Sequence, residues 1–406
     1  MALPHRFGGE EPEESLNLNE ITRQYIKDNL NADVPTLALR KAPVGTDVSL
    51  ALRQIEARQL LQKKVPDWSN NENLLFPARL ALEQCSSEAT ARYKAGLVSG
   101  VTLVDLTGGL GIDSYYLSQS FQEVDYVERQ PDLCNLAKHN FEVMRAPVRV
   151  WNETAEAYLE HCTAIDCIYL DPARRDGYGH KTVDISDCTP NVLDLQDALF
   201  HLSDTVMIKL SPMLDIKKAL DELHNVADVH VLASGNECKE LVFVLRRGFT
   251  GQPTLYAANL MTQQPVVSFT YEEEGKCPLQ LADGVGRYLY EPNAALMKAG
   301  CYKLLAHQFK VRKLHKNSHL YTSDVLVPDF AGRIFEVESY APYNKKTRLT
   351  LLADVEEANL TVRNFPLTVD ALRKSLKIRE GGLVYLFATT IGNGEKILIK
   401  TKKSVS

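Results

Sequence analysis

The 406-residue chain is long enough for two to four domains, and its content of 45% hydrophobic and 24% charged residues is typical of globular proteins, not of disordered or fibrous ones. No stretch approaches the roughly 18 apolar residues of a membrane-spanning helix, and the N-terminus lacks the apolar core of a secretory signal, so we expect a cytoplasmic protein with no membrane partner. The eight cysteines are scattered without a Cys-x-x-Cys pair, which favours reduced thiols and no metal site.

Charge is distributed unevenly along the chain, although the net charge is only −6. Residues 287–406 contain 20 lysines and arginines against 11 acidic residues, whereas residues 1–286 contain 26 against 41. This asymmetry is typical of a catalytic module joined to a module that docks on a polyanion, because phosphate neutralisation supplies most sequence-independent affinity for nucleic acids. The alternative is a lysine-rich surface that contacts only solvent.

The N-terminal part of the chain is expected to be helical and to lead into an α/β sheet. Apolar residues recur at helical spacing between residues 15 and 65, and another helix is predicted over 77–97. Short apolar runs then alternate with amphipathic segments, which predicts a parallel sheet with crossover helices. The seven predicted strands are 102–106, 123–127, 148–151, 167–170, 205–208, 229–233 and 241–245.

A glycine-rich segment between the first predicted strand and a helix is the main candidate for a cofactor site. Glycines there let the backbone approach a ligand closely. Asp105 at the strand end would repel a pyrophosphate but attract the ammonium group of S-adenosylmethionine (SAM). The dinucleotide fingerprint requires glycine at position 114, which is Ser114 here, so SAM is favoured. The candidate cofactor residues of this segment are Asp105, Thr107, Gly108, Gly109, Gly111 and Asp113.

Five further residues are predicted to contact the cofactor, and one of them is Asp171 at the end of the fourth predicted strand. Glu128 ends the second predicted strand, 17 residues after Gly111, where a carboxylate can accept both ribose hydroxyls. Asn152 and Glu153 follow the third strand and are candidates for the adenine edge. Gln84 precedes the first strand, in a helix that can close over the cofactor; the alternative is an ordinary amphipathic helix face.

The segments Asp105–Gly111, with Glu128, and Asp171–Arg175 together resemble class I SAM-dependent methyltransferases. A closer resemblance, to a bacterial methyltransferase family with a THUMP-like C-terminal domain, spans nearly the whole chain and includes segments 76–91, 208–215, 236–240 and 363–368. It implies an α/β fold with a Rossmann-like, seven-stranded sheet. THUMP domains bind structured RNA, so RNA is the implied substrate class. The implied domains are 1–74 (helical), 75–250 (SAM-dependent methyltransferase), 251–322 (ferredoxin-like) and 323–406 (THUMP-like).

The acceptor chemistry is expected at the end of the fourth predicted strand, at the sheet edge where open α/β folds bind ligands. Methyltransferases acting on exocyclic amines carry an Asp/Asn-Pro-Pro-aromatic motif there, whereas this chain continues from Asp171-Pro172 into alanine and Arg174. Asp171 remains the candidate that aligns an amine. Arg174, Arg175 and Lys209 would add positive charge for a phosphate or a base edge, unless the two arginines only pair with nearby acids.

Methylation of uridine C5 is the alternative chemistry, because Asp-Pro followed by arginine is also similar to the motif of the enzymes that catalyse it. Those enzymes need a cysteine nucleophile after the next strand, where this chain has Ser211. Serine is a far weaker nucleophile than a thiolate, and Cys188 lies in a connection between strands. We therefore expect the acceptor to be a base amine or a ring nitrogen.

The C-terminal third is predicted to be a small α+β region. A helix is expected after Glu291, with Pro292 in its first turn, and a strand at 334–339. A helix at 370–377 should end at Gly381-Gly382, before a final strand at 383–389.

Residues 310–319 form the most basic segment and are predicted to contact RNA phosphates. His315 and His319 would share a face of a helix, but without a third ligand they predict no metal. The candidate RNA-contacting residues here are Lys310, Arg312, Lys313 and Lys316.

Two other functional classes fit the sequence less well. A catalytically silent RNA-binding protein could keep this fold, but Asp105 and Glu128 are both present. Methylation of DNA or protein is the other alternative, since the basic region alone does not separate RNA from DNA.

Overall fold

The structure is a computed structural model that describes residues 18–174, 184–344 and 350–404. It contains two compact units, Met1–Leu170 and Asp171–Ser406. No helix in the described ranges is long and apolar enough to cross a membrane.

The first unit begins with the predicted helices. The first three follow Asn19, Asp33 and Asp47, whose side chains accept a hydrogen bond from a backbone N–H of the first turn. Their apolar faces share a core that includes Leu37 and Ile55. The helices are α1 (Glu20–Asp28), α2 (Val34–Ala38), α3 (Val48–Leu61) and α4 (Pro66–Ser69).

The helix predicted over 77–97 is two helices, α5 (Arg79–Gln84) and α6 (Glu88–Ala95). The backbone is extended at Cys85 and Ser87, and the Ser87 side chain accepts a hydrogen bond from the Thr90 N–H. Serine side chains compete with helix hydrogen bonding and favour this capping role, so the single predicted helix was wrong.

A parallel sheet completes the first unit, in the strand order β4-β1-β2-β3. The central strand β1 pairs with β4 and β2, and Asp105 lies opposite Tyr169 and Tyr126 in these pairings. The four strands confirm the predicted ones. The elements are β1 (Gly100–Asp105), α7 (Ile112–Leu117), β2 (Phe121–Val127), α8 (Pro131–Met144), β3 (Val148–Trp151), α9 (Ala155–Leu159) and β4 (Cys167–Leu170).

The first strands of the second unit pair in the order β7-β9-β8-β10-β11, and β9 is antiparallel to both of its neighbours. The last three predicted strands are confirmed as β7, β8 and β9. Residues 254–269, assigned from sequence to the ferredoxin-like region, pair with β8 and with one another as β10 and β11. The elements are β5 (Ala173–Arg174), η1 (Ile185–Asp187), β6 (Cys188–Thr189), α10 (Val192–Leu202), β7 (Thr205–Leu210), α11 (Ile216–Glu222), β8 (Val226–Ser234), β9 (Glu237–Arg246), β10 (Thr254–Leu260) and β11 (Val267–Phe269).

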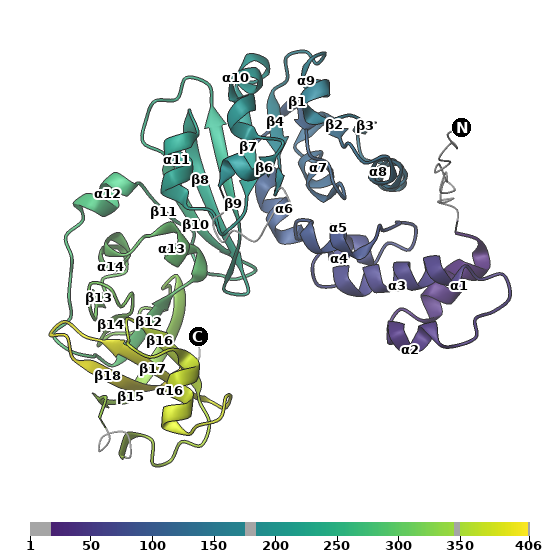
Figure 1. Ribbon diagram of the computed structural model, residues 1–406. Coiled ribbons are helices and arrows are strands. Elements are labelled where there is room, and N and C mark those ends of the chain that lie inside the picture. Colours follow the sequence, from purple (N-terminus) through teal and green to yellow (C-terminus); the bar gives the residue numbers. More distant parts are fainter. Residues whose placement is uncertain (1–17, 175–183, 345–349, 405–406) are drawn as a thin grey trace, which may run out of the picture. The chain divides into compact units, whose positions relative to one another are not determined.

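The rest of the second unit is built on a seven-stranded sheet, in the order β13-β14-β12-β15-β18-β17-β16 (Figure 1). Its core includes Leu289, Phe335 and Phe387 from three different strands. The elements are α12 (Tyr271–Lys276), β12 (Tyr288–Pro292), α13 (Ala294–Ala299), α14 (Lys303–Gln308), β13 (Arg312–Lys313), β14 (Tyr321–Ser323), β15 (Gly332–Pro342), β16 (Asn359–Arg363), α16 (Val369–Leu376), β17 (Val384–Thr390) and β18 (Lys396–Lys403).

Three details of this region differ from the sequence prediction. Pro292 ends β12, and α13 begins only after Asn293, whose side chain accepts the Leu296 N–H. Helix α16 ends at Leu376 and is capped by Lys377, which has a φ of 59°, before the glycine pair is reached. Strand β18 was not predicted. It lies between β15 and β17 with five consecutive buried residues, so it lacks the alternation of a half-exposed strand.

Candidate cofactor and acceptor site

The loop between β1 and α7 has a conformation that requires glycine. Gly109 and Gly111 have φ values of 54° and 82°, in the left-handed region. At Gly108 the backbone lies against the Tyr126 ring, since a Cβ atom there would be 2.2 Å from Tyr126 Cε2. The Tyr126 hydroxyl donates to the Gly109 carbonyl oxygen at 2.6 Å. The loop is therefore held in one shape by the strand beside it.

Asp105 is buried beneath this loop and organises it. Its Oδ1 accepts the Thr107 N–H at 3.0 Å, and its Oδ2 accepts the Ser114 hydroxyl at 2.6 Å. The structure thus gives the carboxylate a role in shaping the loop, which the sequence analysis missed. Ser114 stands where the dinucleotide fingerprint has a glycine, and its hydroxyl holds the Asp105 carboxylate.

Glu128 connects the end of β2 to the glycine loop. Its Oε2 accepts the Gly109 N–H at 3.0 Å, and its Oε1 accepts the Gln130 N–H at 2.9 Å. Asn152 donates from Nδ2 to the Glu128 carbonyl oxygen at 2.9 Å. The structure therefore brings together three of the predicted cofactor residues, Gly109, Glu128 and Asn152. A carboxylate oxygen that accepts one N–H can accept another donor, such as a ribose hydroxyl.

Two other predicted cofactor residues have different surroundings. The Glu153 carboxylate lies 2.8 Å from His161 Nε2, so it takes part in a pair on the protein itself. Gln84 is exposed at the end of α5. The nearby Ser86 contacts α7, the helix after the glycine loop, because its hydroxyl donates to Asp113 Oδ2 at 2.7 Å.

Asp113 belongs to a buried polar cluster with Lys94, Ser86 and Tyr169. Lys94 is fully buried; its Nζ lies 2.9 Å from Asp113 Oδ1 and donates to the Ser86 hydroxyl at 2.8 Å. The Tyr169 hydroxyl donates to Asp113 Oδ2 at 2.8 Å. The cluster connects three elements: Lys94 lies in α6, Asp113 in α7 and Tyr169 in β4. Sequence reasoning missed Lys94, because nothing in the pattern of a short helix marks a lysine as buried.

Asp171, the candidate acceptor-site residue, follows directly after β4. Asp171 therefore lies at the carboxyl end of β4, which ends at Leu170. The predicted partner Lys209, on β7, donates from Nζ to Asp171 Oδ2. The Asp171 side chain stays 33% exposed, whereas that of Lys209 is 13% exposed. The lysine thus fixes a carboxylate that a substrate can still reach.

The other residues of the Asp171–Arg175 motif form the start of a connection. Pro172 is buried, and the backbone of Arg174 pairs with that of Cys188 in the short β5-β6 ladder. Arg175 lies outside the described residues. Cys188 is itself buried, at 4% exposure, which does not suit an attacking nucleophile.

The basic segment 310–319 is only partly exposed. Lys313 is buried, donates from Nζ to the Lys316 carbonyl oxygen at 2.9 Å and lies 5.2 Å from the centre of the Tyr302 ring. Burial lowers the pKa of Lys313 to about 8. Its predicted contact with RNA is therefore wrong for this conformation, because a fully enclosed ammonium cannot reach a phosphate. The residues of the segment that are exposed as predicted are Lys310, Arg312 and Lys316.

The two histidines of this segment do not share a helix face, because residues 314–320 form a turn. His315 Nδ1 accepts the Asn317 N–H at 3.1 Å, and His319 has a φ of 50°. Within the described ranges, no group of three or more metal-ligating side chains could hold a metal ion.

Comparison with known proteins adds relatives over most of the chain. Models of a ferredoxin-like domain and a THUMP domain-like module match residues 288–330 and 332–403. The chain is 33% identical to a candidate methyltransferase from Porphyromonas gingivalis W83, whose crystal structure matches with a TM-score of 0.84. The match covers 95% of this chain and 98% of that one. Two uncharacterised SAM-dependent methyltransferases of Mycobacterium tuberculosis, strains CDC 1551 and H37Rv, are each 23% identical over 317 residues, 77% of this chain and 84% of theirs.

Proposed function

The chain belongs to the family of SAM-dependent methyltransferases with a THUMP-like C-terminal region, and we propose that it methylates a nucleobase nitrogen of a structured RNA. The observation that carries the RNA assignment is the THUMP domain-like match over residues 332–403. The excess of positive charge in the same part of the chain supports it, since 20 basic residues stand against 11 acidic ones from residue 287 onwards.

The residues around the glycine loop fit SAM. A Cβ atom at Gly109 would meet only the Thr107 carbonyl oxygen, at 3.8 Å, so the loop has open space above this residue. Beside it lies the Glu128 carboxylate, which we propose accepts the ribose hydroxyls. The loop from Thr107 to Gly111 would hold the methionine part, and Asn152 would contact the adenine. SAM supplies a methyl group on a positively charged sulfur.

At the acceptor, we assign the central role to Asp171. Its carboxylate would accept a hydrogen bond from the N–H of the base and so direct the nitrogen lone pair towards the methyl group. Lys209 would hold the carboxylate in place, which reduces the entropy lost when the base binds. A hydrogen-bond acceptor at this point suits an amine or ring nitrogen better than a carbon acceptor, because carbon methylation at C5 needs a thiolate.

The test is a methyl-transfer assay with the purified full chain, tritiated SAM and total RNA from cells that lack the gene, followed by mass spectrometry of the nucleosides. We expect label in one methylated nucleoside. Asp171→Ala should lower kcat about 100-fold, because the aligning acceptor is lost, while SAM affinity changes little.

Asp204→Asn is the matched control, since Asp204 is an exposed aspartate of the same unit that pairs with Arg247. It should keep the wild-type rate. Transfer of label to DNA or protein but not to RNA would reject the RNA assignment, and full activity of Asp171→Ala would reject the role of that residue.

A further inference from the structure

Two arginines in the C-terminal sheet share one buried carboxylate. Glu291, on β12, is 1% exposed and accepts hydrogen bonds at Oε2 from Nε and Nη2 of Arg333, with the Nε contact at 2.8 Å. Its Oε1 accepts Nη2 of Arg363 at 2.9 Å. Arg333 lies opposite Glu291 in the β12-β15 pairing, whereas Arg363 ends β16, at the far end of the strand order. The cluster carries two positive charges and one negative charge.

The close packing of the strands holds this cluster in place. A Cβ atom at Gly332, next to Arg333, would lie 2.1 Å from the Glu291 carbonyl oxygen, so only glycine allows this approach. The Arg333 guanidinium also lies 5.5 Å from the centre of the Phe335 ring. The planes of the guanidinium groups are therefore set by the protein before any ligand binds, which lowers the entropy cost of binding.

Both guanidinium groups retain donors. Each has five N–H groups, and the hydrogen bonds to Glu291 use two from Arg333 and one from Arg363. The side chains are 35% and 37% exposed, but Arg363 Nε is buried without a partner among the described residues, so the donors of Arg363 that can reach a ligand are those of its Nη atoms. One arginine would be enough to neutralise Glu291. The second leaves a fixed, donor-rich positive charge at the surface.

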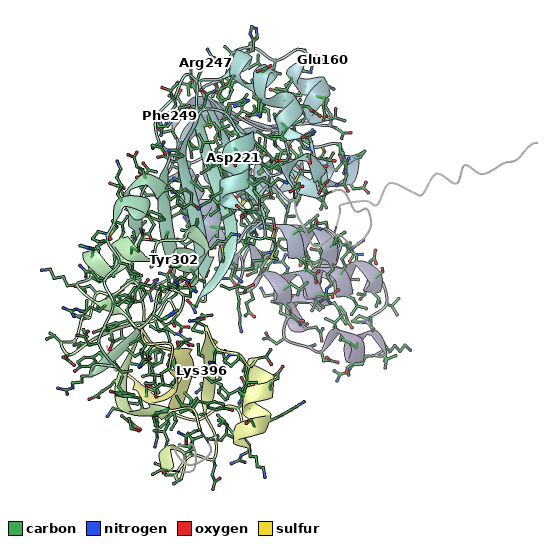
Figure 2. The ribbon with its side chains drawn as sticks, turned by 60° about the vertical axis from the view of Figure 1, so that its left-hand side comes forward. Glu160, Asp221, Arg247, Phe249, Tyr302 and Lys396 are labelled. Carbon is green, nitrogen blue, oxygen red and sulfur yellow. The ribbon has the colours of Figure 1, made fainter. Side chains whose placement is uncertain are left out.

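The end of β16 that carries Arg363 lies beside the basic segment 310–319. Nδ2 of the neighbouring Asn364 lies 2.9 Å from His315 Nδ1, so the end of β16 contacts the turn that carries the exposed Lys316. Burial, together with the charges of Lys313 and Arg363, lowers the pKa of His319 to about 4. The His319 ring packs on that of Tyr302, which is labelled in Figure 2.

We propose that Arg333 and Arg363 bind a phosphodiester group of the RNA substrate. The planar fork of a guanidinium matches two phosphate oxygens, and two such forks fixed by one carboxylate form a preorganised anion site. The inference rests on the proposed RNA methyltransferase function and assigns part of its substrate-binding surface. Lys316 would contact an adjacent phosphate.

The test measures binding of fluorescein-labelled unfractionated tRNA to the full chain by anisotropy at several NaCl concentrations. Arg363→Gln should weaken binding about five- to tenfold at 100 mM NaCl and lower the salt slope by about one, because one phosphate contact is lost. Arg363→Lys keeps the charge but not the fork, so it should weaken binding less and leave the slope unchanged. Arg379→Gln, at an exposed arginine paired with Glu356, is the control and should bind within about twofold of the wild type.

Equal tRNA affinity of Arg363→Gln and the wild type, with equal thermal stability, would overturn the inference while leaving the RNA function standing. Failure of the wild-type chain to bind tRNA would instead reject the proposed function.

Discussion

Lys94 places a positive charge in the interior of the first unit, beside Asp113, Ser86 and the Tyr169 ring. Removing water from an ammonium group is costly, and the attraction to a well-placed carboxylate offsets that cost. Asp113 lies in the first turn of α7, directly after the glycine loop, and Lys94 lies in α6, so the pair connects that loop to the core.

We predict that Lys94→Met destabilises the protein by about 3–5 kcal/mol, because Asp113 would remain buried without its cation. Urea unfolding followed by circular dichroism measures the change. Lys63→Met, at an exposed lysine that follows α3, is the control and should change the stability by no more than about 0.5 kcal/mol. Equal stability of the two variants would contradict the assigned role of the pair.

Among single residues, those found from sequence were the acids and glycines with a fixed spacing from a strand end. Asp105, Glu128 and Asp171 were identified because successive parallel strands end at the same sheet edge. Their exact partners were not predicted. That Asp105 would bind Thr107 and Ser114 follows from the path of the loop, which the local sequence does not encode in any simple pattern.

At the scale of an element, the loop between β1 and α7 depends on its contact with β2. Gly108 packs on the Tyr126 ring, and that ring is fully buried, so it has little room to move. The same tyrosine bonds the Gly109 carbonyl oxygen, and the shape of the loop is therefore coupled to the position of one aromatic side chain.

We predict that Gly108→Ala weakens SAM binding at least about tenfold and lowers stability by about 1–3 kcal/mol, because the added methyl group overlaps the Tyr126 ring. Isothermal titration calorimetry with SAM checks the first effect and urea unfolding the second. Gly275→Ala, where a Cβ atom would meet nothing within 4 Å, is the control and should bind SAM like the wild type. Unchanged SAM affinity in Gly108→Ala would show that the loop tolerates a different path.

Element boundaries were predicted well where periodicity was clean and poorly where capping or full burial decided. The strands of the parallel sheet agree with the prediction because continuous apolar runs bounded by polar turns have few other interpretations. The break between α5 and α6 depends on Ser87, whose side chain accepts a hydrogen bond from the Thr90 N–H. Strand β18 lies inside the sheet between β15 and β17 and has five consecutive buried residues, a position that no local pattern reveals.

For the molecule as a whole, the buried histidine His230 predicts a pH dependence of stability. It lies on β8, stacked on Tyr256 at 4.6 Å, and burial lowers its pKa from about 6.5 to about 4. Between these values the unfolded chain binds a proton that the folded protein does not. The contribution of His230 to stability is therefore complete above pH 6.5 and is lost as the pH falls towards 4.

We predict that His230→Phe reduces this loss by about 2–3 kcal/mol at pH 4, because phenylalanine can stack on Tyr256 without taking up a proton. Urea unfolding at pH 7 and at pH 4 measures the difference. His201→Gln, at an exposed histidine of α10, is the control and should retain the wild-type pH dependence. An unaltered dependence in His230→Phe would mean that other groups dominate the acid response.

The sequence by itself determined the α/β class and the positions of seven strands along the chain, and it singled out the glycine loop, because periodicity, glycine spacing and strand-end acids are local properties of the chain. Only the tertiary structure decided which charges are buried and with what partners. Lys313 lies in a basic segment that the sequence predicts to be exposed, yet its side chain is buried in the fold. Arg363 and Glu291 are 72 residues apart and meet only because the strands that carry them are brought together by the fold. Such contacts depend on the packing of the whole sheet, so no pattern within a single segment predicts them.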